Sequence, residues 1–472
     1  MKRARSRLAI VAMTVAVSLP AGAGIAAAGA SSDAPETAAA ADSLSWTPPR
    51  ANFPRAALEV IGTNVLVWSF DRFIRDGGEL EEFRVGWDSI WDNIENRMEW
   101  DNNNFSTNNF LHPYHGSLYY NAARANGFGY WESAPFAFAG SYLWEFVGEA
   151  NNPAYNDWIN TAVGGMAFGE TLYRLSDLVL DDTATGGKRF WRESLGLLID
   201  PMRGFNRIFS GEWSRVGLNP PDRRRSRAGL RIETGLRSQG RESLANQDTS
   251  GAFVALDFLH GDPFFDDDIR PFDNFSLGLQ LNFNDVARVG RMQIQGLLSG
   301  KHLSESEHTW HILGSYQYFE YIKNRGYEYG GQSVGGLWLS RFGGRGVTYA
   351  LVTDVGLGLL LLGGTSSDVA NFSGRTYDYG SGLTYRLGAR LFRRGHVVAE
   401  LSSEGSWMYT LNGVRGEYFV TIVELLASVP VWRDLGLGAK FQGYYRKAWY
   451  DDYADSSHWL PEVRGFVSLG LD

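Results

Sequence analysis

Two histidines and four carboxylate residues in the N-terminal half of the chain have the side chains best suited to chemistry. His112 and His115 lie three residues apart, on either side of Pro113 and Tyr114. Imidazole nitrogens and carboxylate oxygens can transfer protons or bind a metal ion. The pattern predicts an acid–base or metal site with these candidate catalytic residues: His112, His115, Glu132, Glu145, Glu149 and Asp157. The alternative is that both histidines cap or hydrogen-bond helix ends, and the sequence leaves metal binding open.

Glu145 and Glu149 form a pattern of their own, because residues four apart share one face of a helix. Two carboxyl groups close together push their pKa values apart, so that one can donate a proton and the other accept it. The alternative, which we favour, is a buried salt bridge between these glutamates and Arg124 or Arg174.

A structural polar cluster is predicted along one long helix. Glu170 and Arg174 are four residues apart in the order that favours a helical ion pair, and Asp177 follows three residues later. Together with Arg124, these charges lie in an otherwise apolar stretch. We expect them to lock the helix against its neighbours rather than to take part in a reaction.

The elements that position these residues are predicted to be helices between about residues 110 and 215. Proline is tolerated in the first turn of a helix, where its missing N–H would form no bond. Four prolines accordingly mark predicted helix starts: Pro113, Pro135, Pro153 and Pro201. Gly165 and Gly169 lie four residues apart in the third of these helices, and this face of small residues predicts the close approach of another helix.

The C-terminal half alternates apolar and polar residues from about residue 228 onward. Every second residue from Phe275 to Phe283 is apolar, and alternate side chains of a strand face opposite sides. About twelve such segments predict an antiparallel transmembrane β-barrel, which has no unpaired edge. A soluble β-sandwich with similar alternation is the alternative. The predicted lumen-facing residues are Arg386, Arg390, Lys440, Gln442 and Arg446.

The composition agrees with a membrane barrel and excludes several other classes. The chain of 472 residues contains 56 glycines, and 14% of its residues are aromatic, as in barrels that sit in membranes. It has no cysteine, which excludes disulfides, thiolate zinc sites and cysteine catalysis. Its net charge of -9 and the lack of a P-loop indicate neither a nucleic-acid nor a nucleotide partner, and no cofactor is predicted.

The beginning of the chain predicts export. Basic residues from Lys2 to Arg7 precede an apolar run, and Ala28-Gly29-Ala30 is typical of a signal-peptidase cleavage site. We predict a signal peptide at residues 1–30, a linker and N-terminal extension at 31–84, a helical domain at 85–215 and an outer-membrane barrel at 222–472. The predicted fold is mainly β with an α-helical N-terminal part, which is either a plug in the barrel or a periplasmic domain. The expected location is the outer membrane of a Gram-negative envelope, and the expected partners are outer-membrane lipid and the barrel-assembly machinery.

The stretch around the histidines resembles a bacterial family. The residues that carry the resemblance are His112-Pro113-Tyr114-His115-Gly116, Tyr119-Tyr120-Asn121-Ala122-Ala123-Arg124, Trp144-Glu145-Phe146, Gly169-Glu170 and Arg174-Leu175-Ser176. They are similar to the family catalogued as domain of unknown function thirty-nine forty-three, over about residues 85–215. The resemblance implies an exported outer-membrane protein with a helical N-terminal part and a β-rich remainder. It implies no reaction, substrate or partner.

Two functions follow from these patterns. The first is a non-enzymatic outer-membrane barrel that serves envelope structure or the passage of a small or lipidic solute. The alternative is a membrane-associated envelope enzyme, a hydrolase of lipid or cell-wall material that uses the His/Glu/Asp cluster. Polar residues at membrane depth mark pathways as well as chemistry, so we favour the first and leave enzymatic activity open.

Overall fold

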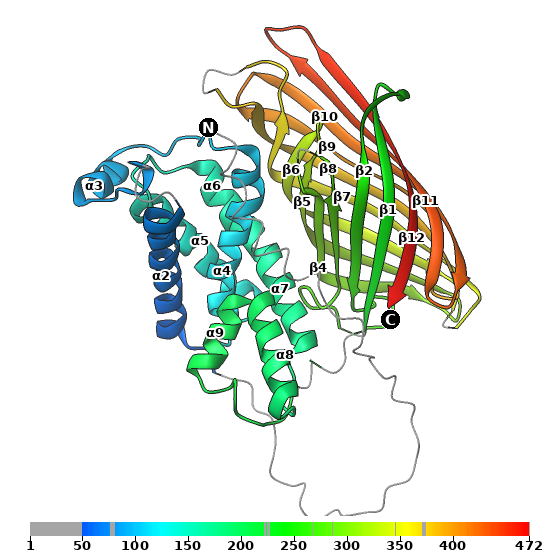
Figure 1. Ribbon diagram of the computed structural model, residues 1–472, viewed down its shortest axis with the longest axis horizontal. Helices are drawn as coiled ribbons and strands as arrows, with labels where there is room; N and C mark the ends of the chain where they lie inside the picture. Colours follow the sequence, from blue (N-terminus) through cyan, green and yellow to red (C-terminus); the bar gives the residue numbers. More distant parts are fainter. Residues whose placement is uncertain are drawn as a thin grey trace, which may run out of the picture. The chain divides into compact units, whose positions relative to one another are not determined.

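In the computed structural model, the C-terminal half of the chain forms a closed antiparallel barrel of twelve strands. The model describes residues 50–75, 81–220, 223, 227–266, 268–285, 287–344, 346–370 and 374–471. Neighbours in sequence are neighbours in the barrel, and β1 closes the ring against β12 (Figure 1). The strands are β1 (Ala228–Arg241), β2 (Ser243–His260), β3 (Phe275–Asn282), β4 (Val289–Glu305), β5 (Thr309–Lys323), β6 (Glu328–Phe342), β7 (Tyr349–Ser366), β8 (Tyr377–Arg393), β9 (His396–Asn412), β10 (Gly416–Trp432), β11 (Leu435–Tyr450) and β12 (Ser456–Leu471). The predicted barrel is confirmed, whereas the predicted signal peptide lies outside the described residues.

The two faces of the barrel wall follow from the strand register, because directly paired residues point to the same side. Gln293 pairs with Glu320, and Ile294 pairs with Phe319. Arg291 of β4 reaches Glu404 of β9, which lies across the ring, so the face that carries Arg291, Gln293 and Glu320 lines the lumen. The face that carries Ile294 and Phe319 is therefore the outer face of the wall.

The N-terminal half is helical and includes several π-helical turns. Its α-helices are α2 (Phe53–Phe70), α3 (Trp87–Glu95), α4 (His112–Ala125), α5 (Tyr130–Leu143), α6 (Tyr155–Ile159), α7 (Gly165–Val179), α8 (Gly186–Ile199) and α9 (Pro201–Phe209). The π-helical turns and one 3-10 turn are η2 (Asp71–Arg75), η3 (Glu81–Phe83), η4 (Thr107–Leu111), η5 (Trp144–Gly148) and η6 (Asn160–Gly164). The first described helix thus lies inside the predicted linker and extension. None of the helices that the structure describes is both long and apolar enough to cross a membrane.

The helix starts follow the proline signals in two of four cases. Pro113 lies in the first turn of α4, and Pro201 begins α9, where the Asp200 side chain accepts a hydrogen bond from the Arg203 N–H at 3.1 Å. The start predicted at Pro135 is wrong. α5 begins five residues earlier, where Glu132 Oε2 accepts a bond from the Gly129 N–H at 2.9 Å and fixes the first turn. The start predicted at Pro153 moves to Tyr155.

Helices α4 and α7 cross with their backbones in contact, as the small-residue face predicts. A Cβ placed on Gly165 would lie 2.7 Å from the Cα of Gly116, and one placed on Gly116 would overlap the carbonyl oxygen of Thr161. Farther along α7, a Cβ on Gly169 would lie 2.6 Å from the Tyr120 ring. Only hydrogen in place of a side chain permits this approach.

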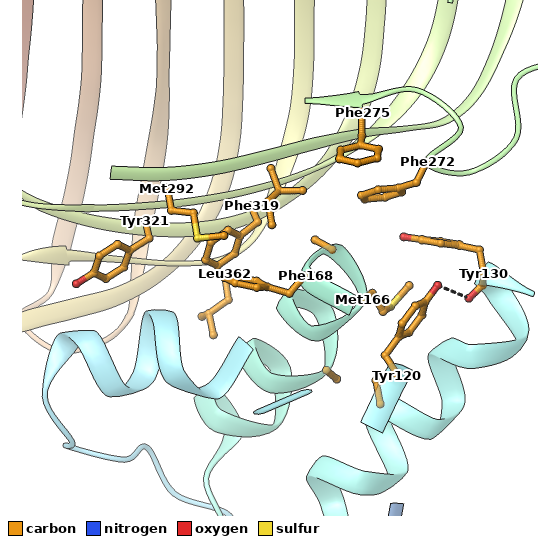
Figure 2. Close-up of a cluster of buried hydrophobic side chains, with 14 of the residues drawn as sticks. Tyr120, Tyr130, Met166, Phe168, Phe272, Phe275, Met292, Phe319, Tyr321 and Leu362 are labelled. Atoms are coloured by element: carbon orange, nitrogen blue, oxygen red, sulfur yellow. Dashed lines mark hydrogen bonds between the residues drawn. The ribbon is translucent and has the colours of Figure 1, made fainter. Parts of the chain in front are cut away.

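The helices pack on the outer face of the barrel wall through a large aromatic cluster. Figure 2 shows Phe168 of α7 beside Phe319 of β5, and their ring centroids are 4.8 Å apart. Tyr130 of α5 stacks on Phe272 at 5.5 Å. We call this set the helix–barrel cluster, and its buried members include Tyr120, Tyr130, Met166, Phe168, Phe272, Phe275, Met292, Ile294, Phe319, Tyr321, Leu362, Tyr377 and Tyr379.

This packing excludes one of the two predicted placements of the helices, a plug inside the barrel. Met292 and Phe319 belong to the outer face, since their chain neighbours Arg291 and Glu320 point into the lumen. An apolar helix face needs an apolar surface to pack on, and on these strands the lumen face carries charges while the outer face carries apolar side chains. The helical region therefore lies outside the barrel and not within it.

Candidate functional site

The contact between His112 and Asp157 is the centre of the predicted acid–base cluster. Nε2 of His112, at the start of α4, lies 3.6 Å from Oδ1 of Asp157 on α6, and Nδ1 lies 3.3 Å from Oγ1 of Thr161. Burial lowers the pKa of His112 to about 4, although the negative charge of Asp101 opposes this shift. Burial also raises the pKa of Asp157 well above its ordinary value, and Asp101 adds to the effect. The pair is therefore set for a neutral imidazole near pH 7.

His115 occupies an aromatic setting one turn along α4. Its ring lies edge-on to Trp144 at a centroid distance of 4.9 Å, and its Nε2 is 2.8 Å from the hydroxyl of Tyr119. Burial lowers the pKa of His115 to about 3, and the nearby His112 adds to the shift. The two histidines thus share a helix but have different partners.

Glu145 is buried and Glu149 is half-buried, and the two do not share the helix face that their spacing predicts. The π-helical turn ends at Gly148, and Glu149 is extended, with φ -126° and ψ 152°. Glu145 accepts a hydrogen bond from the Ala154 N–H at 2.8 Å, and Glu149 accepts one from the indole of Trp144 at 2.6 Å. Burial raises the pKa of both carboxyl groups well above the ordinary value. The two glutamates do not form the predicted salt bridge with Arg124 or Arg174, because both arginines bind Glu170 instead.

Four further residues join this cluster to the outer face of the barrel. The side-chain amide of Asn108 donates to Asp101 at 3.0 Å and to the hydroxyl of Tyr377 at 2.9 Å. Arg375 donates to the carbonyl of Asp101 at 2.9 Å. The amide of Asn156 donates to Asp157 at 2.6 Å and to the hydroxyl of Tyr379 at 3.3 Å. The sequence analysis did not place Asp101, Asn108, Asn156 or Arg375 in the site, although Asn108 belongs to the dense run of asparagines before His112.

Glu132 lies apart from the other five candidates. It is exposed on the first turn of α5 and caps the backbone N–H of Gly129. Its position in the chain suggested a partner for the histidines, but its hydrogen bond serves its own helix. The structure therefore assigns Glu132 to helix capping and not to the cluster.

The cluster has neither the geometry of a metal site nor a place on the cleft beside the β2–β3 loop. Among the described residues, no group of three or more histidines and carboxylates is close enough to hold a metal ion. A cleft of about 1120 Å³ lies between the helices and the β2–β3 loop, and residues such as Arg174, Asp177 and Asp273 line it. None of the six candidate catalytic residues belongs to its lining.

The predicted structural cluster centres on Glu170, which is fully buried. Arg124 binds both of its carboxylate oxygens, at 2.6 and 3.0 Å, and Arg174 binds it at 2.8 Å. Arg174 also reaches the β2–β3 loop, where it binds Asp273 at 2.8 Å. The ion cluster therefore links α4, α7 and the barrel.

Asp177 belongs to a neighbouring network and not to the Glu170 cluster. It binds Arg203 at 2.6 Å and Arg223 at 3.2 Å, rather than Arg174. The spacing of three residues from Arg174 permitted the predicted contact, but α9 offers Asp177 a closer guanidinium. The two arginines neutralise the charge of Asp177.

A layer of paired charges crosses the lumen of the barrel. Arg291 binds Glu404 and lies 3.5 Å from Glu424, while Lys440 lies 3.2 Å from Glu424 and 3.3 Å from Glu233. We call these five residues the charged layer. Sequence reasoning placed Lys440 in the lumen but missed the other four. The contacts of Arg291 with Glu404 and of Lys440 with Glu233 join strands that are distant in sequence.

The predicted lumen-facing residues lie on the lumen face of the wall. Arg386 is 3.4 Å from Glu404, and Gln442 donates to Glu424, so both adjoin the charged layer. Arg390 binds Glu400 of the adjacent strand at 2.5 Å. Arg446 binds Asp368 of the β7–β8 loop at 2.6 Å.

Apolar side chains fill the lumen on both sides of the charged layer. One set lies toward the β5–β6 turn and consists of Ile322, Tyr327, Tyr329, Val420, Ile422, Tyr444 and Leu460. The other contains Phe253, Ala255, Leu426 and Phe466. The described cavity beside Glu404 and Arg386 measures about 10 Å³, which is at the lower limit for a single water molecule. Side chains therefore occupy the lumen on both sides of the charged layer.

A comparison with protein families bears on the helical region. The family model described as "Domain of unknown function (DUF3943)" matches residues 97–202. This match confirms the resemblance. We call residues 97–202 the DUF3943 region, and it contains all six candidate catalytic residues together with Arg124, Glu170 and Arg174. No curated protein matches the chain.

The barrel has distant likenesses among solved structures. The toluene transporter TodX of P. putida is 7% identical, with a TM-score of 0.21, over 52% of this chain and 90% of its own. The outer membrane channel DcaP of Acinetobacter baumannii is 7% identical, with a TM-score of 0.22, over 52% of this chain and 97% of its own. OpdQ of Pseudomonas aeruginosa is 10% identical, with a TM-score of 0.19, over 52% and 97%. At these TM-scores the likenesses carry no argument, and the barrel fold rests on its own strand pairing.

Replacing His115 with phenylalanine should change how the stability of the helical region depends on pH. The lowered pKa means that the unfolded chain binds a proton more readily than the folded one. His115 therefore contributes stability that is complete above about pH 6.5 and declines by about 1.4 kcal/mol per pH unit below it. We expect the stability of the unsubstituted protein relative to His115→Phe to be greatest above pH 6.5 and to fall toward pH 4, as measured by urea unfolding.

The exposed His308, in the β4–β5 turn, provides the control for this experiment. His308→Phe is measured in the same way, so that the pH dependence that follows from losing a histidine side chain as such can be subtracted. If the difference between the unsubstituted protein and His115→Phe were constant with pH, or grew as the pH fell, the buried neutral state of His115 would be wrong.

Proposed function

We propose that the chain is an outer-membrane protein whose barrel is a closed anchor for the DUF3943 region, with a role in envelope structure. The outer face of the barrel supports the location, because large apolar side chains are exposed along strands that the helices leave uncovered. Examples are Leu357, Leu383, Leu401, Leu425 and Leu437. Soluble proteins rarely expose so continuous an apolar surface, and a closed barrel satisfies its backbone hydrogen bonds in lipid.

The charged layer is the observation that carries the proposal of an anchor instead of a pore. Its ion pairs join β1, β4, β9, β10 and β11 across the lumen. A solute would have to separate buried pairs whose partners would then lack both water and counter-charge, which costs several kcal/mol. Passage of a solute through the lumen is therefore not part of the proposal.

The hydrolase alternative has less support than the anchor. His112, Glu145 and Asp157 are close together and buried, which suits a structural network beneath the helix–barrel interface. The large cleft, where a substrate would have room, is lined by other residues. We therefore assign the cluster to the attachment of the helices to the barrel wall.

The anchor predicts that the purified protein does not conduct ions across a planar lipid bilayer. Insertion can be verified separately by a shift in SDS-gel mobility between unheated and boiled samples. The double variant Arg291→Ala/Glu404→Ala removes the centre of the charged layer and should produce conductance steps. Steady conductance by the unsubstituted protein would overturn the proposal that the barrel is closed.

A further inference from the structure

We infer that the exposed face of α2 is a membrane-contact surface, which the acyl chains of the same bilayer that surrounds the barrel cover. This inference rests on the proposed location in the outer membrane. It goes beyond that location, because it places part of the helical region in lipid rather than in the aqueous periplasm.

The exposed and the buried faces of α2 differ in composition. Every exposed residue between Phe53 and Phe70 is apolar, and Leu58 and Leu66 expose 68% and 70% of their surface. The opposite face, with Ala56 and Val60, is buried against Tyr119 of α4 and Phe136 of α5. A helix between a protein core and water normally has a polar outer face, so the exposed face of α2 suits an apolar solvent.

The charged residues of α2 are turned toward the protein. Arg55 and Glu59 form an ion pair at 3.0 Å, and Arg55 also donates to the carbonyl of Asn206 at 3.0 Å. The amide of Asn126 donates to Glu59 at 2.7 Å. Both charges are thus satisfied on the inner side of the helix, as expected where the outer side lacks water to solvate them.

The barrel wall supplies the reason why the apolar solvent is lipid. On β7, Leu362 is buried in the helix–barrel cluster, whereas Leu357 and Leu359 on the same strand are 69% and 57% exposed. The cover of the outer face therefore changes from protein to lipid within one strand. The helices that bury Leu362 lie beside the apolar outer wall, and α2 packs on α4 and α5 of the same helical region.

Single introduced cysteines can test this inference cleanly, because the chain contains none of its own. Leu66→Cys reports on α2, Leu357→Cys on the outer face of the barrel, and Asp452→Cys on an exposed β11–β12 loop. Each variant is labelled with the environment-sensitive dye NBD and reconstituted into phosphatidylcholine vesicles. Quenching is then measured with doxyl-labelled phosphatidylcholine in the bilayer and with iodide in the water.

We expect the dye at residue 66 to lose as much fluorescence to doxyl lipid as the dye at residue 357, and to resist iodide. The dye at residue 452 should show the reverse. Iodide quenching at residue 66 equal to that at residue 452 would overturn the inference. Protection of residue 66 from both quenchers would also overturn it, because protein, such as a second copy of the chain, would then cover α2. In either case, lipid quenching at residue 357 leaves the membrane location standing. Its loss at residue 357 would overturn the location and, with it, the inference.

Discussion

Replacing Glu170 with alanine is expected to destabilise the helical region by about 3–5 kcal/mol, the usual effect of removing one partner of a buried ion pair. Glu170 is fully buried, and its two oxygens bind Arg124 and Arg174. The hydroxyl of Tyr120 donates to the same carboxylate at 3.0 Å. Without Glu170, two guanidinium groups would remain in the interior, Arg124 without its carboxylate and Arg174 with only Asp273.

Urea unfolding followed by helical circular dichroism measures this effect. Glu132→Ala is the matched control, since it removes a glutamate that only caps the exposed start of α5. Its expected cost is about 1 kcal/mol. A Glu170→Ala variant no less stable than Glu132→Ala would contradict the ion cluster as the lock of the helical region.

Replacing Gly116 with alanine should prevent α4 and α7 from closing, with a loss of about 3 kcal/mol, at the upper end of the usual effect of overpacking. A Cβ on Gly116 would overlap the Thr161 carbonyl, and the next nearest atoms are also backbone atoms. Backbone cannot move aside as the end of a flexible side chain can. The loss would occur although alanine favours a helix over glycine by about 1 kcal/mol.

Gly62 of α2 is the matched control for this effect, because a Cβ there would meet nothing within 4 Å. Gly62→Ala should leave stability unchanged or raise it by up to about 1 kcal/mol through helix propensity alone. Equal effects of Gly62→Ala and Gly116→Ala in thermal unfolding would show that the helix crossing is not tight.

The barrel could be predicted from sequence because the alternation of a strand is a local property. The alternation from Phe275 to Phe283 shows which side chains share a face of the strand, and no other segment is needed to see it. What covers an outer face is not local. All three of Phe319, Leu362 and Leu357 lie on the outer face of the barrel. The helices cover Phe319 and Leu362 but leave Leu357 exposed, although all three are large apolar residues that suit either setting. For this reason the sequence left open whether the helices plug the barrel or lie outside it.

The candidate site was predictable where its contacts lie within one helix. Glu170 and Arg174 meet at the spacing that suits an ion pair. The prediction from the spacing of Glu145 and Glu149 was wrong, because Glu145 lies in a π-helical turn that ends at Gly148 and Glu149 is extended. The contact of His112 with Asp157 depends on how α4 and α6 pack. The contacts of Arg291 with Glu404 and of Lys440 with Glu233 depend on how the barrel closes. The spacing of residues in the sequence encodes neither.

Disulfide trapping tests the central claim, that the helices pack on the outer face of the barrel, most directly. A Cβ on Gly330 of β6 would lie 2.8 Å from the Cβ of Asn109 in η4. The next residue, Gly331, faces the lumen, and a Cβ there would lie 2.6 Å from the hydroxyl of Tyr329 and would also contact Leu360. The predicted result is that Asn109→Cys/Gly330→Cys cross-links under mild oxidation and that Asn109→Cys/Gly331→Cys does not. Cross-linking of the Gly331 pair alone would place the helices inside the barrel and contradict the account.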